Sequence, residues 1–273
     1  MKENKKIMPE RFCTLDTNMS LEKLIMAQEN KIPVVGRVLL WNSQEKNLKV
    51  DLGNDIYGFL PIDLASIYPS SLDNGDLTSS IRAIIGKPIL TIIEQVSFNG
   101  EGTMIKLNRK ILMLDAFNFV SNSIGKTVEC CVTGIVAFGV FVDVGNGLSG
   151  LIHHKDLCIP RLKDFRELGF DVGDKITAKI IDVNDNFQIS LNYKDQFENM
   201  ALTTNRNDLV IATILKQHNN DGFFGCTNPN TPVLIDIPSD VNCYYGDKIL
   251  ARAKAPKKKH PDKLNLVFHS FVK

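Results

Sequence analysis

The sequence lacks a large excess of charge of either sign. Its 273 residues include 32 Lys and Arg against 31 Asp and Glu, a formal net charge of +1. Over the whole chain, this balance excludes the strongly basic composition that is typical of nucleic-acid-binding proteins. The longest apolar window, residues 135–142, is interrupted by Gly139 and is far shorter than the ~20 residues of a membrane helix. With no apolar signal segment near the N-terminus, we expect a soluble cytoplasmic protein without a membrane partner.

Motifs for catalysis, cofactors and metals are also missing. The six cysteines form no Cys-x-x-Cys pair, and His153 and His154 with Cys158 nearby do not supply the four paired ligands of a structural zinc site. There is no Gly-rich phosphate loop and no Ser or Cys nucleophile with an assignable base. Asp51 and Asp143 occupy a repeated turn and are interpreted as barrel residues. We expect a non-catalytic protein without cofactor, metal or small-molecule substrate.

Internal repeats are present. The paired segments are residues 49–54 and 141–146, 58–61 and 150–153, and 105–110 and 189–194. A third copy is fainter and rests mostly on residues 246–249, which repeat the Gly-Asp-Lys-Ile of residues 173–176. Such recurrence predicts copies of one structural unit along the chain.

Each unit shows the period-two pattern of strands with one buried face. In the middle unit Val140, Val142 and Val144 alternate with Phe141 and Asp143. About five short strands in a unit of roughly 70 residues fit the five-stranded OB barrel. The predicted fold is therefore all-β with short connecting helices, made of three tandem five-stranded OB barrels of which the first and third are divergent.

Helical spacing is confined to the joints between these units. Leu21, Leu24 and Ile25 follow Ser20 at the spacing of one helix face. The expected organisation is an N-terminal arm and short helix (1–30), a divergent barrel (31–110), a connecting helix (111–123), a well-formed barrel (124–194), a linker (195–207) and a degenerate barrel with a basic hairpin (208–273).

The middle unit contains the most informative residues. Phe141 has the parity opposite to the core valines and points outward, and His153 is expected on the neighbouring strand. Phe138 shares the parity of the valines, so we expect it to reach the same face through a bulge at Gly139. Two phenylalanines and a histidine on one outer face would form a stacking platform for bases, worth ~1–3 kcal/mol per base.

At these residues the chain resembles a known family, the RNA-binding domain first described in ribosomal protein S1. The resemblance covers residues 124–194 and includes the segments Phe138–Gly145, Gly150–Leu157, Gly173–Ile176 and Ile189–Leu191. It implies an OB barrel that binds single-stranded RNA through Phe138, Phe141 and His153.

Two further contacts of that family depart from its pattern. An acidic residue and an arginine fall here on Asn184 and Gln188, and both positions are uncharged. The departure argues against phosphate pairing at this end and predicts that the domain binds RNA more weakly and with more dependence on stacking. Lys155 and Lys179 are candidate substitutes for the lost charge, although each is also read as an ordinary solvated lysine.

The outer units carry secondary candidates. In the first, Lys46 and Lys49 take the places of Phe138 and Phe141, and Pro61 replaces His153. These lysines could steer phosphates, but a structural or protein-docking barrel with solvated lysines is the favoured reading.

In the third unit Phe224 follows Gly222 as Phe141 follows Gly139. Its basic run of Lys257, Lys258 and Lys259 is either a solvated loop tip or a source of charge for phosphates. The order of the three units resembles compact S1-like proteins of low-GC Gram-positive bacteria.

Two hypotheses for the function remain, and they describe different classes of protein. The leading hypothesis is a non-catalytic protein that binds single-stranded RNA, with mRNA in translation or the small ribosomal subunit as its partner. The alternative is an adaptor that docks on ribosome, polymerase or ribonuclease, with RNA contact incidental.

The near-zero net charge is a cancellation between unlike segments. Residues 121–199 carry 8 basic and 11 acidic side chains, a charge of −3, whereas residues 200–273 carry 10 basic and 6 acidic, a charge of +4. The best stacking face thus lies in the most acidic segment, and we expect a shallow salt dependence with steering from the last barrel.

Overall fold

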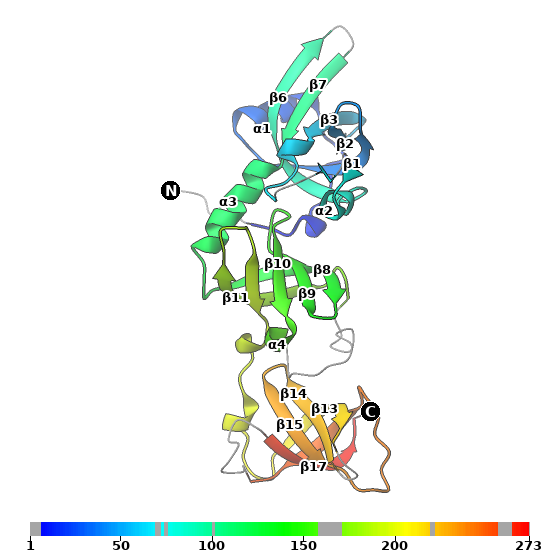
Figure 1. Ribbon diagram of the computed structural model, residues 1–273, viewed down its shortest axis with the longest axis vertical. Coiled ribbons are helices and arrows are strands. Elements are labelled where there is room, and N and C mark those ends of the chain that lie inside the picture. Colours follow the sequence, from blue (N-terminus) through cyan, green and yellow to red (C-terminus); the bar gives the residue numbers. More distant parts are fainter. Residues whose placement is uncertain are drawn as a thin grey trace. The chain divides into compact units, whose positions relative to one another are not determined.

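A computed structural model describes residues 7–68, 72–73, 76–99, 102–157, 171–218, 222–255 and 264–272. Most of the regular structure is β-strand, and the strands form three closed five-stranded barrels joined by short helices (Figure 1). The fold class predicted from the repeats is therefore confirmed. Among the described residues, none of the helices has the length and apolar character needed to cross a membrane.

The first barrel has the strand order β1-β2-β3-β7-β6. Neighbouring strands are antiparallel except β3 and β7, which pair in parallel through Phe59 and Lys106. Alternate residues such as Leu48 and Val50 point into its core and are fully buried. The strands are β1 (Val34–Asn42), β2 (Asn47–Gly53), β3 (Ile56–Pro61), β6 (Pro88–Asn99) and β7 (Gly102–Asn108).

The second and third barrels repeat this arrangement, with the fifth strand inserted between the third and the fourth. In the second barrel Val140, Val142 and Val144 are buried, as their alternation predicts. Its strands are β8 (Thr127–Val136), β9 (Gly139–Asp143), β10 (Ser149–His153), β11 (Lys175–Val183) and β12 (Ile189–Asn192). Those of the third are β13 (Leu209–Gln217), β14 (Gly222–Asn228), β15 (Thr231–Asp236), β16 (Lys248–Ala253) and β17 (Leu264–Phe271).

Helices are short. Two of them lie at the joints, as expected, whereas two others lie within the first and second barrels, between the third and fourth strands. The helix expected after Ser20 forms as α1 (Leu21–Glu29), because the Ser20 hydroxyl caps it by accepting a hydrogen bond from the backbone N–H of Lys23 at 3.3 Å. The remaining short elements are α2 (Ser79–Arg82), α3 (Lys110–Ser121), α4 (His154–Leu157), the 3-10 turns η1 (Glu10–Phe12), η2 (Ile62–Leu64), η4 (Lys194–Gln196) and η5 (Met200–Leu202), and the two-stranded pair β4 (Leu72–Asp73) and β5 (Asp76–Leu77).

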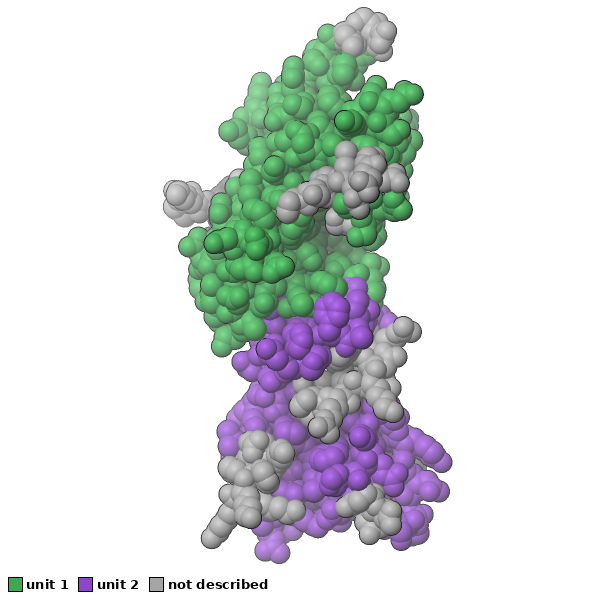
Figure 2. Space-filling view, in the orientation of Figure 1, with its two compact units in different colours: residues 1–133, 141–151, 172–190 green, residues 134–140, 152–171, 191–273 purple. Residues whose placement is uncertain are grey.

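The chain divides into two compact units, shown in different colours in Figure 2. The first unit comprises residues 1–133, 141–151 and 172–190, and the second comprises residues 134–140, 152–171 and 191–273. The residues of the second barrel are thus shared between the two units.

The repeated turn is the same at the level of atoms in the first two barrels. The Asp51 carboxylate accepts a hydrogen bond from the backbone N–H of Gly53 at 2.8 Å, and Asp143 accepts the same bond from Gly145 at 2.8 Å. Both glycines have positive φ, 95° and 131°, which side-chain-bearing residues adopt only at a cost. This Asp-x-Gly turn explains why the two segments recur in the sequence.

The N-terminal segment joins these two turns within the first unit. At one end, the backbone N–H of Asn146 donates to the Met8 carbonyl at 2.9 Å, and that of Glu10 donates to the Asp143 carboxylate at 2.8 Å. At the other, the Asn54 amide donates to the Met19 carbonyl at 3.0 Å. The arm is therefore part of the fold and connects the first barrel to strands of the second.

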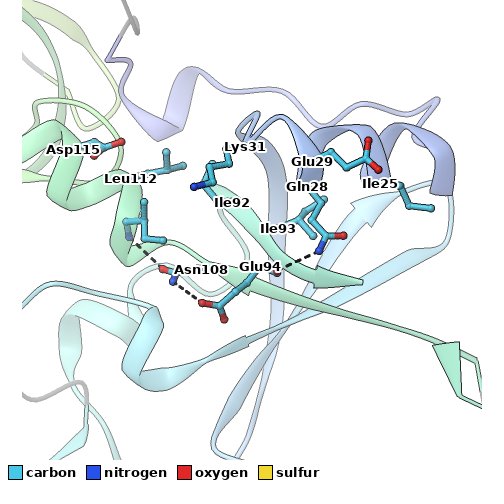
Figure 3. A pocket seen from close by; sticks show the side chains of 11 residues that line it. Ile25, Gln28, Glu29, Lys31, Ile92, Ile93, Glu94, Asn108, Leu112 and Asp115 are labelled. Atoms are coloured by element: carbon cyan, nitrogen blue, oxygen red, sulfur yellow. Dashed lines mark hydrogen bonds between the residues drawn. The ribbon is translucent and has the colours of Figure 1, made fainter. Parts of the chain in front are cut away.

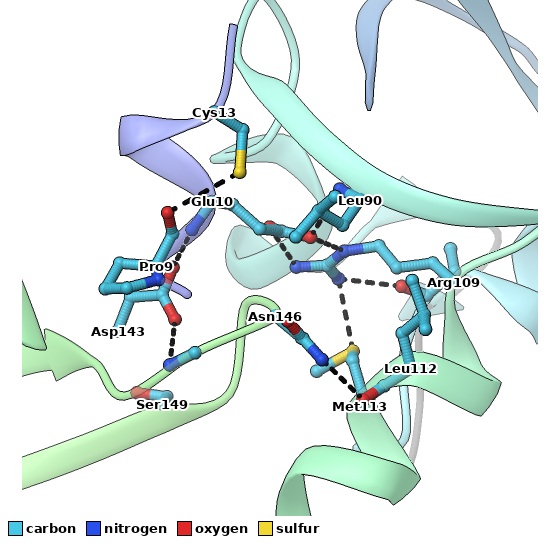
Figure 4. A network of polar contacts seen from close by, with 12 residues as sticks. Pro9, Glu10, Cys13, Leu90, Arg109, Leu112, Met113, Asp143, Asn146 and Ser149 are labelled. Atoms are coloured by element: carbon cyan, nitrogen blue, oxygen red, sulfur yellow. Dashed lines mark hydrogen bonds and ion pairs between the residues drawn. The ribbon is translucent and has the colours of Figure 1, made fainter. Parts of the chain in front are cut away.

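A buried ion pair anchors this arm (Figure 4). The Arg109 guanidinium donates from Nε to Glu10 at 2.8 Å and from Nη2 at 2.7 Å, and its Nη1 donates to the Ala65 carbonyl at 2.8 Å. The Glu10 carboxylate also accepts the backbone N–H of Leu90 at 3.0 Å. The two charged side chains are only 5% and 7% exposed, so their hydrogen bonds are needed to offset the loss of water.

Asp143 completes the network and has an unusual proton affinity. Burial, reinforced by the nearby Glu10 carboxylate, raises the pKa of Asp143 to about 7, although two backbone N–H donors and Arg109 act in the opposite direction. The folded pKa lies above the ordinary Asp value, so protonation favours the folded state. The contribution of this bound proton to the free energy of unfolding is fully present below about pH 4 and is lost as the pH rises through 7.

We predict that the free energy of unfolding of the native chain, relative to that of Asp143→Asn, falls between pH 4 and pH 8, because only the native side chain must lose a proton inside the fold. Urea denaturation of both proteins across this range measures the difference. Asp51→Asn is the control for the change from carboxylate to amide in the equivalent turn of the first barrel. A difference that stays constant with pH would contradict the assignment of this proton to Asp143.

Candidate nucleic-acid interface

Phe138 reaches solvent from a turn. It lies in the two-residue turn between β8 and β9, and its side chain is 49% exposed. Its carbonyl accepts the backbone N–H of His154 at 2.9 Å, which holds the turn beside the end of β10. A position in this turn, before the first residue of β9, therefore places Phe138 on the surface.

Gly139 permits a close approach of two backbones. A Cβ atom at this position would overlap the carbonyl oxygen of Ile152 and lie 3.1 Å from the Cα of His153. Because these are backbone atoms, they have little freedom to move aside. The glycine thus sets how closely the turn that carries Phe138 approaches the histidine.

Phe141 and His153 lie on neighbouring strands of the second barrel. Phe141 is half-buried between the fully buried Val140 and Val142, as expected for an outward residue. His153 ends β10 and is also half-buried, and its Nδ1 accepts the backbone N–H of Lys155 at 3.4 Å. In the neutral ring this leaves the proton on Nε2, where it can be donated to a ligand.

Two lysines were candidates for phosphate contacts in this unit. Lys155 is exposed on α4, and its carbonyl accepts the ammonium of Lys194 at 2.8 Å. Lys179 is half-buried on β11. Each lysine carries positive charge at the surface of the second barrel, and Lys155 is two residues from His153.

The uncharged pair Asn184 and Gln188, in the hairpin between β11 and β12, is itself hydrogen-bonded. The Asn184 amide donates to the Gln188 side-chain oxygen at 2.8 Å, and the backbone N–H of Gln188 donates back to Asn184 at 3.0 Å. At the hairpin tip Phe187 has φ of 60° and makes edge contacts with Phe117, 4.8 Å between centroids, and with Tyr68, 6.5 Å. The tip is therefore packed against α3, and this end of the barrel offers amides instead of charges.

The first barrel carries aromatic residues beside its candidate lysines. Lys46 is exposed in the β1–β2 turn, and Lys49 is exposed on β2 with its ammonium 4.2 Å from the centre of the Tyr57 ring. Sequence reasoning missed Tyr57 and its neighbour Phe59. The signal available in the sequence was alternation along the strand. Gly58 and Leu60 are buried, so Tyr57 and Phe59, which alternate with them, point outward.

The third barrel shows a similar pairing. Phe223 is buried and Phe224 is 40% exposed on β14, with its ring 4.5 Å from that of His218. His218 was also missed, because it lies outside the segment that the repeats align. Lys257, Lys258 and Lys259 lie outside the described residues.

A pocket of about 670 Å³ opens between α1, β6 and α3 in the first unit (Figure 3). Apolar side chains such as Ile93 form part of its wall, and its polar lining includes three carboxylates, Glu29, Glu94 and Asp115, against Lys31 alone. A hydrogen bond from Lys106 lowers the pKa of Glu94, which keeps that carboxylate ionised. This lining repels phosphates, so the pocket does not fit a nucleic-acid backbone.

Throughout the described ranges, His, Cys, Asp and Glu side chains do not gather in the groups of three or more that would hold a metal ion. His153 and His154 lie together with ring centroids 4.1 Å apart, and Cys158 is outside the described residues.

Comparison with known proteins finds a family match for the middle of the chain. The family model described as S1 RNA binding domain matches residues 122–194. Small ribosomal subunit protein bS1 of Chlamydia trachomatis serovar D is 36% identical over 73 residues, which are 26% of this chain and 13% of that protein.

Two enzymes share longer segments. Polyribonucleotide nucleotidyltransferase of Chlamydia muridarum is 30% identical over 152 residues, 50% of this chain and 22% of the enzyme. The 4-hydroxy-3-methylbut-2-enyl diphosphate reductase of Fusobacterium nucleatum is 30% identical over 131 residues, 44% of this chain and 15% of the enzyme. The chain thus spans less than a quarter of the length of each of these relatives.

We predict that Gly139→Ala destabilises the protein by ~1–3 kcal/mol, because the added methyl group must displace the backbone at Ile152. Denaturant unfolding followed by circular dichroism measures the change. An alanine variant as stable as the native chain would show that the two backbones are not held at this separation.

Proposed function

We propose that this chain, in which residues 122–194 form an S1 RNA-binding domain, binds single-stranded RNA by stacking bases on Phe138 and Phe141 beside His153. The observation that carries the proposal is the exposed ring of Phe138 at a turn that is hydrogen-bonded to the end of the strand bearing His153. Aromatic rings on an OB face accept any base, since every base has a π-face.

The remaining polar groups give the proposed site little charge. Asn184 and Gln188 supply amides, and the candidate cations of this barrel are Lys155 and Lys179. Residues 121–199 as a whole are acidic, with 11 carboxylates against 8 basic side chains. Stacking is thus the main source of affinity, and phosphate attraction is supplied by the basic residues 200–273, which include Lys257, Lys258 and Lys259.

The cellular role that we propose is non-catalytic binding of mRNA in the bacterial cytoplasm, during translation or at the small ribosomal subunit. The similarity to protein bS1 supports this role. The two enzymes in the comparison share 22% or less of their length with this chain, so their activities are not carried over. We also propose that residues 195–207 are a linker between the second and third barrels.

A second candidate is a protein-docking adaptor. The acidic pocket between α1, β6 and α3 favours it, because an apolar wall with three carboxylates suits a basic segment of a partner protein. Pull-down with and without nuclease distinguishes the two functions: partners that persist after RNA is digested favour the adaptor.

We predict that Phe138→Leu combined with Phe141→Leu weakens binding of a fluorescent 12-nucleotide oligouridine at least about tenfold, because each lost stack costs ~1–3 kcal/mol. Leucine retains apolar bulk and removes only the π-face. Fluorescence anisotropy measures the dissociation constants.

The matched control is Phe119→Leu, which removes an exposed ring from α3 and from none of the barrel strands. It is expected to bind as the native chain does. Unchanged affinity in the double variant would show that RNA does not stack on this face.

A separate prediction concerns salt. Replacing Lys257, Lys258 and Lys259 by glutamine is expected to reduce the slope of log affinity against log salt by up to about 2, since each phosphate contact with a single strand contributes ~0.7. The phenylalanine double variant is expected to lose affinity with no change in slope. Titrations from low to high salt test both, and a steep slope that survives the lysine replacements would disprove this division of roles.

A further inference from the structure

The outer surface of the first barrel carries a second aromatic and basic cluster, which we call the Tyr57 face. It consists of Lys49 on β2, Tyr57 and Phe59 on β3, and Lys106 on β7. These residues point outward, because the residues that alternate with them on the same strands are buried; those residues are Leu48, Val50, Gly58, Leu60, Ile105 and Leu107.

Strand pairing brings the members of this face together. Lys49 is the register partner of Phe59 across the β2–β3 pair, and Lys106 is the partner of Phe59 across β3–β7. Phe59 therefore lies between two lysines. Tyr57 is two residues away on the same side of β3, and its ring lies 4.2 Å from the Lys49 ammonium.

The two lysines are held differently. Lys106 forms an ion pair with Glu94 at 2.7 Å, so much of its charge is neutralised locally. Lys49 lies over the face of an aromatic ring that is itself 41% exposed. A cation on an exposed ring is a weak contact, ~0.5–1 kcal/mol, so the ammonium can leave the ring for a phosphate while a base takes its place.

We infer that the Tyr57 face is a second binding surface for single-stranded RNA, in which bases stack on Tyr57 and Phe59 while Lys49 contacts the phosphate backbone. The surface formed by the second and third strands is where OB barrels bind oligonucleotides. Here the rings stand on the third strand, and lysine occupies the second-strand place that Phe141 holds in the second barrel. The inference concerns a different barrel from the proposed function and does not depend on it.

Charge and chemistry favour RNA over a protein on this surface. The exposed Tyr57 ring and the half-buried Phe59 ring lie beside Lys49, and the exposed Lys46 in the adjoining turn adds a second positive charge, whereas Lys106 is paired with Glu94. A strand of RNA offers both partners at the spacing of one nucleotide, a flat base and an anionic phosphate.

Photo-crosslinking of the full chain to a 20-nucleotide oligouridine that contains 4-thiouridine tests the inference. Trypsin separates the two surfaces cleanly, because residues 50–82 hold Tyr57 and Phe59 on one peptide and residues 127–155 hold Phe138, Phe141 and His153 on another. We expect crosslinks on both peptides.

Variants then assign the crosslink on residues 50–82. Tyr57→Leu with Phe59→Leu is expected to lower its yield at least fivefold and to leave the yield on residues 127–155 unchanged. Tyr57→Phe retains the π-face and is expected to restore most of the loss attributable to Tyr57→Leu alone. Because the Tyr57 side chain is 41% exposed, Tyr57→Leu alone is expected to fold normally, and it tests the face even if the double variant misfolds. Phe119→Leu is again the matched control.

The outcomes separate this inference from the proposed function. Crosslinks confined to residues 127–155 overturn the inference and support the proposed function, and an occupant of the Tyr57 face would then be a protein. Crosslinks confined to residues 50–82 support the inference and contradict the proposed function. A crosslink on residues 50–82 that survives the double variant overturns the assignment to these rings.

Discussion

The buried contact between Glu10 and Arg109 is the constraint on which the first unit depends. The pair joins the N-terminal arm to the first barrel through the Leu90 and Ala65 backbones, and the Glu10 N–H reaches Asp143 in the second barrel. Breaking a buried ion pair on one side typically costs about 3–5 kcal/mol, because the remaining charge stays buried without a partner. Such a contact tolerates little change in the positions of the elements it connects.

The network also explains how one repeated turn acquires two roles. In the first barrel Asp51 closes its own turn and stays half-buried at the surface. In the second, the arm covers the equivalent Asp143, whose second carboxylate oxygen accepts the Glu10 N–H. The same short motif therefore has an ordinary structural role in one copy and a buried, proton-binding role in the other, and the difference comes from what packs over it.

Three simple structural features place the residues of the proposed RNA face on the surface of the second barrel. A two-residue turn exposes Phe138, strand parity exposes Phe141, and a glycine lets the turn approach the strand that ends at His153. The hairpin between β11 and β12 carries an uncharged hydrogen-bonded pair, Asn184 with Gln188. In the first barrel Tyr57 and Phe59 lie on the third strand, β3, whereas Phe141 lies on the second strand of its barrel. The same framework allows both positions, because alternate residues of each strand point outward.

Much of this protein was determined by local sequence. Period-two alternation predicted the strands and their buried valines, the Asp-x-Gly repeat predicted equivalent turns, and outward parity predicted Phe141. These features depend on residues close together in the chain. Alternation did not show that Phe138 lies outside the strand, in the two-residue turn before β9.

Only the tertiary structure decided which side chains meet across long separations. Glu10 lies 99 residues from Arg109 and 133 from Asp143, and neither pairing has a local signal. The Tyr57 face likewise needed the register of β2, β3 and β7, since Lys49, Phe59 and Lys106 become neighbours only when the barrel closes. Alternation shows which face of a strand a residue occupies, whereas its neighbours depend on pairing between distant strands, and that pairing is determined by the packing of the whole barrel.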